Sequence, residues 1–425
     1  MNRLPKFQAG FAPFLAVAAL FSAAGSLHAE DWARFRGPNG AGISDVAFDA
    51  PITEASFAWR IELPGQGHSS PVVRGERIYL TSADPETAKR IVLCLSAKDG
   101  SEVWRREFES KTFKQHADNS YASSTPAVDD LGVYVAWSTP ESLAVHAFDL
   151  DGKDLWQKDL GAYISQHGSG ASPMLVDDLV IMPADQEGPQ SAVVALDHRT
   201  GQQRWRIDRR SSDKAEMSTP CVFRPKDLPP QLILSSKGTG VTAVDPKTGT
   251  VIWQAPDACV ARTVGSAALT DDLVIQACGD GTTVREMVAI RPYPASSAGA
   301  TVSKPQVAYH ISKISPYVPT PVVKDGMMFM WADNGVVTCV KAETGETIWS
   351  ERVGGQFYGS PVCAGQTLWA MSRKGKLVGV SAGPQFKLVG ELDLGEPTQA
   401  TPAIAGGRMY LRTQSHLICV KPPGK

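Results

Sequence analysis

The sequence lacks a second long apolar run, an excess of one charge, and the residue spacings typical of metal sites. Beyond residues 11–24 no stretch is apolar enough to cross a bilayer, so we expect a soluble mature protein without a membrane span. The 42 Lys and Arg residues nearly balance the 44 Asp and Glu residues and are dispersed, which argues against nucleic acid as a partner. No C-x-x-C or helical His spacing is present, so we assign no metal site.

Cysteine is scarce, and the seven residues are scattered along the chain. An odd, scattered set does not predict a disulfide framework. Five of them occupy strand positions that hold small or apolar residues in related segments, which predicts buried thiols: Cys94, Cys221, Cys339, Cys363 and Cys419. Cys259 and Cys278 remain, and they either stay reduced or form one disulfide.

The first 29 residues have the three parts of a secretory signal peptide. Arg3 and Lys6 precede the apolar run of residues 11–24, and small residues lead to a predicted cleavage after Ala29. The first cysteine is Cys94, so no lipid acceptor follows the cleavage point. We therefore expect an exported protein, periplasmic or extracellular, whose mature chain is residues 30–425.

A Ser/Thr-Pro step followed by apolar residues recurs along the chain. Seven copies place prolines at 71, 126, 173, 220, 321, 361 and 402, and SAALT supplies an eighth copy with Ala267 in the proline position. Each step is followed by two further apolar runs, and in several copies by an Asp/Thr-Gly turn and a Trp. Four short strands in each 40 to 55 residues are typical of a β-propeller blade. The sequence predicts an all-β, eight-bladed propeller of four-stranded antiparallel blades.

The two ends of the repeat predict how the ring closes. The last copy ends after its third strand, and residues 57–61 near the start form an unpaired strand that carries Trp59. A closed propeller leaves no loose edge, so we expect this N-terminal strand to complete the last blade. Residues 30–55 precede it as an N-terminal extension of the same domain.

The stretch ALDHRTGQQRW at residues 195–205 contains Asp197, His198 and Arg199, which could suggest an active site. Aligned copies vary freely at these three positions, which favours an exposed turn. The position of Ala195 holds only small residues in all eight copies: Cys94, Ala147, Ala195, Ala243, Ala289, Cys339, Gly379 and Cys419. A Trp packing over that strand from the neighbouring sheet would require such a gap.

The segments just upstream of the eight first strands should gather at one rim of the central channel. They contribute polar and aromatic residues three to six positions before each step: His68, Tyr121, His167, Glu216, Arg262, Tyr317, Tyr358 and Gln399. His116, Asp118 and Asn119 lie slightly further upstream. Such a rim is typical of a ligand or peptide mouth. The alternatives are polar loop tips without a binding role, or a metal held by His68, His116 and His167 with Glu216.

The repeated pattern A-x-D-x-x-T-G-x-x-x-W resembles the pyrroloquinoline-quinone-like (PQQ-like) β-propeller repeat, and DWARFRGPNGAGIS resembles an exported bacterial branch of that family. The resemblance implies one of two functions. The first is a non-enzymatic scaffold that binds an envelope protein, a peptide or a small-molecule ligand. The alternative is a dehydrogenase that oxidises an alcohol or sugar with PQQ and Ca²⁺. The dehydrogenases carry adjacent cysteines, which this chain lacks, so the scaffold is the leading prediction and no cofactor is assigned.

Overall fold

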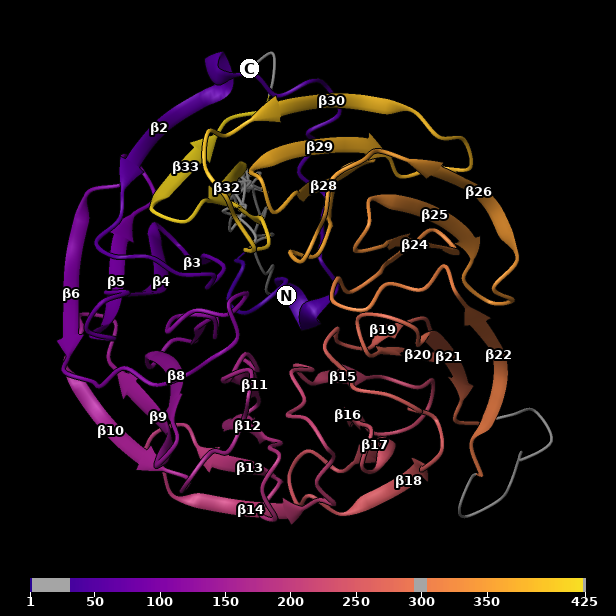
Figure 1. The fold of residues 1–425 in the computed structure, drawn as a ribbon, viewed down its shortest axis with the longest axis horizontal. Helices are drawn as coiled ribbons and strands as arrows, with labels where there is room; N and C mark the ends of the chain where they lie inside the picture. Colours follow the sequence, from indigo (N-terminus) through magenta and orange to yellow (C-terminus); the bar gives the residue numbers. More distant parts are fainter. Residues whose placement is uncertain (2–30, 294–303, 423–425) are drawn as a thin grey trace.

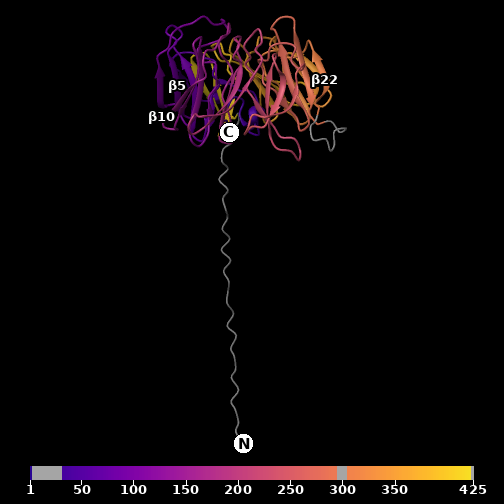
Figure 2. The same cartoon turned by 90° about the horizontal axis from the view of Figure 1, so that it is seen from below.

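The computed structural model describes residue 1 and residues 31–293 and 304–422. The predicted signal peptide therefore lies outside the described residues. In these residues, eight sheets are arranged as a closed ring (Figure 1). Seen from the side, the ring is wider than it is tall (Figure 2). The predicted all-β, eight-bladed propeller is confirmed, and in the described part of the chain no helix could span a membrane.

Each blade contributes one strand to each of four concentric layers. The innermost strands are β3 (Val72–Arg74), β7 (Ala127–Val128), β11 (Met174–Val176), β15 (Cys221–Phe223), β19 (Ala268–Leu269), β23 (Val322–Lys324), β27 (Val362–Ala364) and β31 (Ala403–Ala405). The second strands are β4 (Arg77–Ala83), β8 (Val133–Thr139), β12 (Leu179–Ala184), β16 (Gln231–Ser236), β20 (Val274–Gly279), β24 (Met327–Trp331), β28 (Thr367–Met371) and β32 (Arg408–Arg412).

The outer two layers follow the same order around the ring. The third strands are β5 (Arg90–Ser96), β9 (Ser142–Phe148), β13 (Ala192–Asp197), β17 (Gly240–Val244), β21 (Arg285–Arg291), β25 (Val336–Lys341), β29 (Lys376–Ser381) and β33 (His416–Val420). The outermost strands are β6 (Glu102–Phe108), β10 (Asp154–Asp159), β14 (Gln203–Asp208), β18 (Val251–Ala255), β22 (Gln306–Ser312), β26 (Thr347–Arg352), β30 (Leu388–Asp393) and β2 (Phe57–Glu62). The middle layers are almost wholly buried because each sheet is covered on both faces by its neighbours.

The eighth blade is completed by the N-terminal strand, as predicted. β2 pairs antiparallel with β33, and Trp59 lies opposite Cys419. A further strand was not predicted from the sequence: β1 (Ile43–Ser44) pairs parallel with β27 and adds a fifth strand to the seventh sheet. Two short 3₁₀ turns, η1 (Pro38–Gly40) and η2 (Glu54–Ser56), lie in the same N-terminal segment. Both edges that the sequence left open are therefore paired.

The small position of each third strand lies opposite an aromatic residue on the outermost strand in seven of the eight blades. Ala195, for example, is paired with Trp205. The Trp therefore comes from the same blade, and the prediction of a Trp from the neighbouring sheet is wrong. In several blades the indole also contacts the turn of the next blade. Trp156 of the second blade, for example, covers the turn glycine Gly201 of the third, which has φ +68°, and a Cβ there would lie 2.6 Å from the indole. These contacts fix each blade to the following turn.

The turn at Asp197, His198 and Arg199 is a scaffold turn, but only part of it is exposed. The Asp197 carboxylate accepts hydrogen bonds from the N–H groups of Arg199 and Thr200. His198 is 9% exposed, and its Nδ1 lies 2.8 Å from Asp129 in the preceding blade. The prediction that His198 is an exposed turn residue is therefore wrong, because its ring fills the junction between two blades.

All seven cysteines are free and buried. Cys259 and Cys278 are 4% and 1% exposed, and no disulfide joins them in the structure. Burial raises the pKa of the Cys259 thiol well above its usual value, so this thiol is neutral and unreactive. The five cysteines predicted to act as small apolar residues are buried as expected.

Candidate functional site

A closed circle of hydrogen bonds surrounds the channel at the Ser/Thr-Pro steps. In each blade the N–H of the residue before the proline position donates to the side-chain hydroxyl of the equivalent residue in the next blade, at 2.9 to 3.3 Å. The residues of this hydroxyl ring alternate between Ser and Thr: Ser70, Thr125, Ser172, Thr219, Ser266, Thr320, Ser360 and Thr401. The ring links all eight blades around the axis and explains why the step requires a hydroxyl.

One end of the channel is closed by residues 31–43, here called the N-terminal plug. In Figure 1 the turn η1 of this segment lies at the centre of the ring. Arg36 is 1% exposed, and its guanidinium donates to carbonyl oxygens of Thr320 and Pro321 in the sixth blade and Pro361 in the seventh. Asn39 exchanges two hydrogen bonds of 2.8 Å with the backbone of Val222 in the fourth blade. The plug is therefore held to blades on several sides of the channel.

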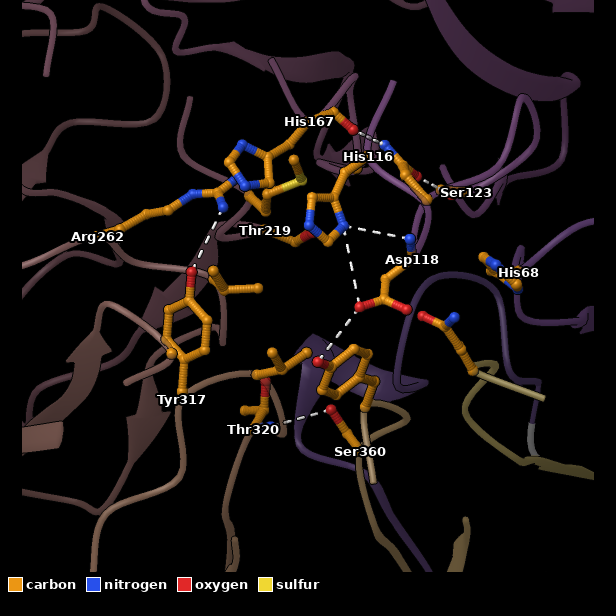
Figure 3. Close-up of a pocket in the computed structure, with 18 of the residues that line it drawn as sticks. His68, His116, Asp118, Ser123, His167, Thr219, Arg262, Tyr317, Thr320 and Ser360 are labelled. Atoms are coloured by element: carbon orange, nitrogen blue, oxygen red, sulfur yellow. Dashed lines mark hydrogen bonds and ion pairs between the residues drawn. The ribbon is translucent and has the colours of Figure 1, made fainter. Parts of the chain in front are cut away.

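The other end of the channel opens into a cavity of about 360 Å³. Its wall includes residues of the hydroxyl ring, and Phe35 of the plug contributes to its lining. Six of the eight predicted rim residues line it: His68, His167, Arg262, Tyr317, Tyr358 and Gln399. Figure 3 shows several of these side chains converging on one open space. The geometry brings together residues that are far apart in the sequence.

Two predicted rim residues do not line this cavity. Glu216 is 3% exposed, and its carboxylate accepts hydrogen bonds from the N–H and the hydroxyl of Thr263. It therefore joins the fourth blade to the fifth. The Tyr121 ring lies beneath the guanidinium of Arg90, 5.0 Å from ring centroid to Cζ, and lines a neighbouring cavity of about 450 Å³.

A long connection between the first two blades, residues 109–123, lies at the opening; we call it the mouth loop. Its Asp118 forms an ion pair with Arg373 of the seventh blade, and the guanidinium stacks 4.5 Å from the ring centroid of Tyr358. Its His116 stacks on His167, with 5.0 Å between centroids. His116, Asp118 and Asn119 border both cavities, so the mouth loop lies between them.

Two histidines of the cavity are neutral at physiological pH. Burial lowers the pKa of His68 to about 4, and the positive charge of Arg412 contributes in the same direction. Burial, followed by the charge of Arg262, lowers the pKa of His167 to about 4. The Nδ1 atoms of both rings are buried without a hydrogen-bond partner. Each imidazole therefore has one nitrogen that forms no hydrogen bond within the protein.

Arg262 and Tyr317 are held in place by their backbones. The carbonyl of Arg262 accepts a hydrogen bond of 3.0 Å from the N–H of Gly279, in an isolated bridge. The N–H of Tyr317 donates to the carboxylate of Asp333 at 2.7 Å. The two side chains meet at the cavity, where the Arg262 Nη1 lies 3.4 Å from the Tyr317 hydroxyl (Figure 3).

Sequence reasoning missed several residues of the cavity wall. These are Phe35, Lys214, Met217, Asp280 and Thr282. Lys214 and Met217 lie within the window of three to six positions before Pro220, but only Glu216 was selected from that window. Phe35 comes from the extension, for which the repeat pattern gives no position, and Asp280 and Thr282 follow a second strand rather than precede a first one.

The wall offers no set of ligands for a metal or for a calcium-bound quinone. Among residues 31–293 and 304–422, no three His, Cys, Asp or Glu side chains converge on a point where they could hold an ion. Calcium requires six to eight oxygen ligands, but the two carboxylates of the wall are already engaged: Asp118 by Arg373, and Asp280 by three N–H groups of its own turn. The described residues of the wall therefore do not fit the Ca²⁺ ion that would accompany PQQ, and His68, His116, His167 and Glu216 do not converge as a set of metal ligands.

The fold and the one-ended channel define an eight-bladed PQQ-like β-propeller. The chain belongs to the family described as outer membrane protein assembly factor BamB, whose model matches residues 47–111, 88–283, 144–382 and 295–413. Over 209 residues it is 23% identical to the outer membrane protein assembly factor BamB of Burkholderia pseudomallei (strain K96243). That match spans 48% of this chain and 47% of the relative, so the chain aligns with about half the length of that relative.

Solved structures share the fold at low sequence identity. BamB from Moraxella catarrhalis superposes with a TM-score of 0.61 at 13% identity, over 87% of this chain and 98% of that one. A quinohemoprotein alcohol dehydrogenase from Comamonas testosteroni superposes with a TM-score of 0.67 at 14% identity, over 93% of this chain and 81% of that one. An assembly factor and an oxidoreductase both match, the oxidoreductase with the higher TM-score, so these similarities establish the fold alone.

Proposed function

We propose that this chain is an exported scaffold of the cell envelope that binds a segment of a partner protein in its channel mouth and thereby takes part in outer-membrane protein assembly. Family membership supports the scaffold role. The observation that carries the binding role is the cavity, which is closed at one end by the plug and lined at the other by side chains from many blades. The predicted signal peptide supports export.

The cavity has the size and composition of a recognition site. Its volume of about 360 Å³ lies within the range of known ligand pockets, roughly 300–1,000 Å³. Tyr317 and Tyr358 supply aromatic surface, and aromatic residues are enriched among the residues that dominate binding. A protruding loop or terminus of a partner would reach these groups, whereas a flat surface would not.

The test is site-specific cross-linking. A photoreactive residue at Gln399 would be introduced into the full chain, cross-linked in the producing cell, and the products identified by mass spectrometry. We expect a product with a component of outer-membrane protein assembly. Tyr317→Ala with Tyr358→Ala should remove this product while leaving the thermal midpoint nearly unchanged, because both side chains are only partly buried.

The matched control changes the opposite face. Arg199 and Lys247 are exposed residues of third-to-fourth-strand turns, and replacing both with Ala should leave the cross-link intact. A cross-link that survives the double Tyr variant and disappears in this control would place the binding surface on the other face. Addition of PQQ and Ca²⁺ to the purified protein tests the alternative, and a bound chromophore with dye reduction would overturn the scaffold assignment.

A further inference from the structure

One wall of the cavity carries a buried positive charge that the protein does not neutralise. Arg262 is 6% exposed. Its Nε donates to the carbonyl of Ala215, its Nη1 reaches the Tyr317 hydroxyl, and its Nη2 is buried without any hydrogen-bond partner. In the described part of the chain no carboxylate lies within ion-pair distance of this guanidinium. A buried charge that lacks a partner is unfavourable, so such an arrangement points to a missing anion.

Two carboxylates follow residues that contact Arg262, Glu216 after Ala215 and Asp280 after Gly279, and both are already hydrogen-bonded to other groups. Glu216 is satisfied by Thr263, Ser212 and the N–H of Lys237. Asp280 accepts hydrogen bonds from the N–H groups of its own turn, which also lower its pKa. Neither forms an ion pair with Arg262, and both keep hydrogen bonds that they would lose by turning towards it.

The groups around Arg262 favour an anion. Lys214, from the connection before the fourth blade, adds a second positive charge to the same wall. Tyr317 offers a hydroxyl, and His167 offers its unpartnered Nδ1. Because burial and the charge of Arg262 keep the pKa of His167 near 4, this ring is a neutral group that can donate one hydrogen bond. Four successive connections, those leading into blades three to six, thus contribute one polar group each.

The other buried arginines of the channel differ in what surrounds them. Arg36 directs its guanidinium to five backbone carbonyl oxygens, and none of its nitrogens is left without a partner. Arg34 and Arg412 each have an unpartnered nitrogen, but neither side chain lines the cavity. Arg262 alone among these four arginines combines an unpartnered nitrogen with a place on the cavity wall.

We infer that the wall formed by Arg262, Tyr317, His167 and Lys214 is a carboxylate-binding site. A guanidinium presents two parallel N–H groups that match the two oxygens of a carboxylate. Arg262 has no such carboxylate partner within the described part of the protein. The inference rests on the proposed function, since it names the chemistry of the partner segment: an acidic side chain or a free C-terminus that enters the mouth. A free small carboxylate shares that chemistry and is the second source to be tested.

The experiment compares acids with their neutral isosteres. Acetyl-Ala-Ala-Glu-amide, acetyl-Ala-Ala-Gln-amide, acetyl-tri-alanine as free acid or amide, and glutarate would each be titrated into the full chain by calorimetry or ligand-observed NMR. We expect acids to bind about tenfold or more tightly than amides, the size expected for a charge-assisted hydrogen bond. Binding by the peptide acids but not by glutarate identifies a peptide as the source, and the reverse identifies a free carboxylate.

Variants decide whether Arg262 carries the preference. Arg262→Gln should abolish the difference between acid and amide, and Tyr317→Phe should reduce it several-fold, whereas Arg199→Gln on the exposed opposite turn should leave it unchanged. If Arg262→Gln does not fold, as judged by its melting transition, Tyr317→Phe and Arg262→Lys decide the question: Lys keeps the charge but not the planar pair of N–H groups, so it should weaken the preference. Equal binding of acids and amides, no binding of any acid, or a preference that survives these substitutions would overturn the inference. The cross-link at Gln399 would still report on the proposed function, so the two failures are distinguishable.

Discussion

The hydroxyl ring predicts that loss of a single side-chain oxygen weakens the whole propeller. Thr125 and Ser70 are 2% and 3% exposed, and the N–H of Ser70 donates to the Thr125 hydroxyl at 3.0 Å. Thr125→Val keeps the shape of the side chain but leaves this buried N–H without an acceptor. Such a loss costs about 1–3 kcal/mol of unfolding free energy. Thr125→Ser retains the oxygen, and serine occupies the same position in four other blades, so it should cost much less.

Urea denaturation monitored by Trp fluorescence would measure the effect. The midpoint of Thr125→Val should fall while the slope of the transition stays constant, because the surface exposed on unfolding is unchanged. Thr248→Val, in the exposed turn between β17 and β18 of the fourth blade, is the matched control and should stay within about 0.5 kcal/mol of the parent. If the Val and Ser variants of Thr125 unfold at the same midpoint, the hydrogen bonds of the ring contribute nothing to stability and the reasoning is refuted.

Three further predictions concern the scaffold. His198→Ala should cost about 1–3 kcal/mol by leaving Asp129 without its 2.8 Å partner, whereas Arg199→Ala should change the denaturation midpoint by less than about 0.5 kcal/mol; equal effects would contradict the burial of His198. Ala195→Leu should overpack the blade and cost about 1–3 kcal/mol by the same assay, and a neutral result would mean that the small position is not filled. Stability should fall as pH drops from about 6.5 to about 4, because the unfolded chain binds protons at His68 and His167 that these partly buried side chains do not bind in the folded protein; replacing both with Gln should make the melting temperature depend less on pH over that window.

The architecture was predictable because it repeats. The Ser/Thr-Pro steps and the paired apolar runs recur in every blade, so errors at one copy are corrected by the others. The closing strand around Trp59 followed from counting strands at the two ends. The N-terminal plug was not predictable in this way, because Arg36 and Asn39 occur once and their partners are backbone carbonyls and N–H groups of distant blades, which no sequence pattern records.

The candidate site was predictable only in outline. The argument that all first strands run the same way placed six of eight rim residues on the cavity wall. The same argument failed for Glu216, whose carboxylate is hydrogen-bonded to Thr263, and for Tyr121, which lines the neighbouring cavity. The direction of a loop side chain depends on local packing rather than on its distance from a strand. The prediction for His198 failed for a related reason. Its position varies between the repeats, which suggested an exposed turn, but the preceding blade buries the side chain.

The plug has a consequence for the order in which the chain can reach its native state. Arg36 contacts residues 284 to 325 positions further along, and β2 pairs with the last strand of the chain. These contacts form only when nearly all of the chain is present, and closing loops of this length is slow. Until then the chain is an open arc with unpaired edges at both ends, which is the state most prone to wrong association. Once β2 has paired with β33, the eighth blade cannot open without losing this pairing, so we expect the closed ring to unfold slowly.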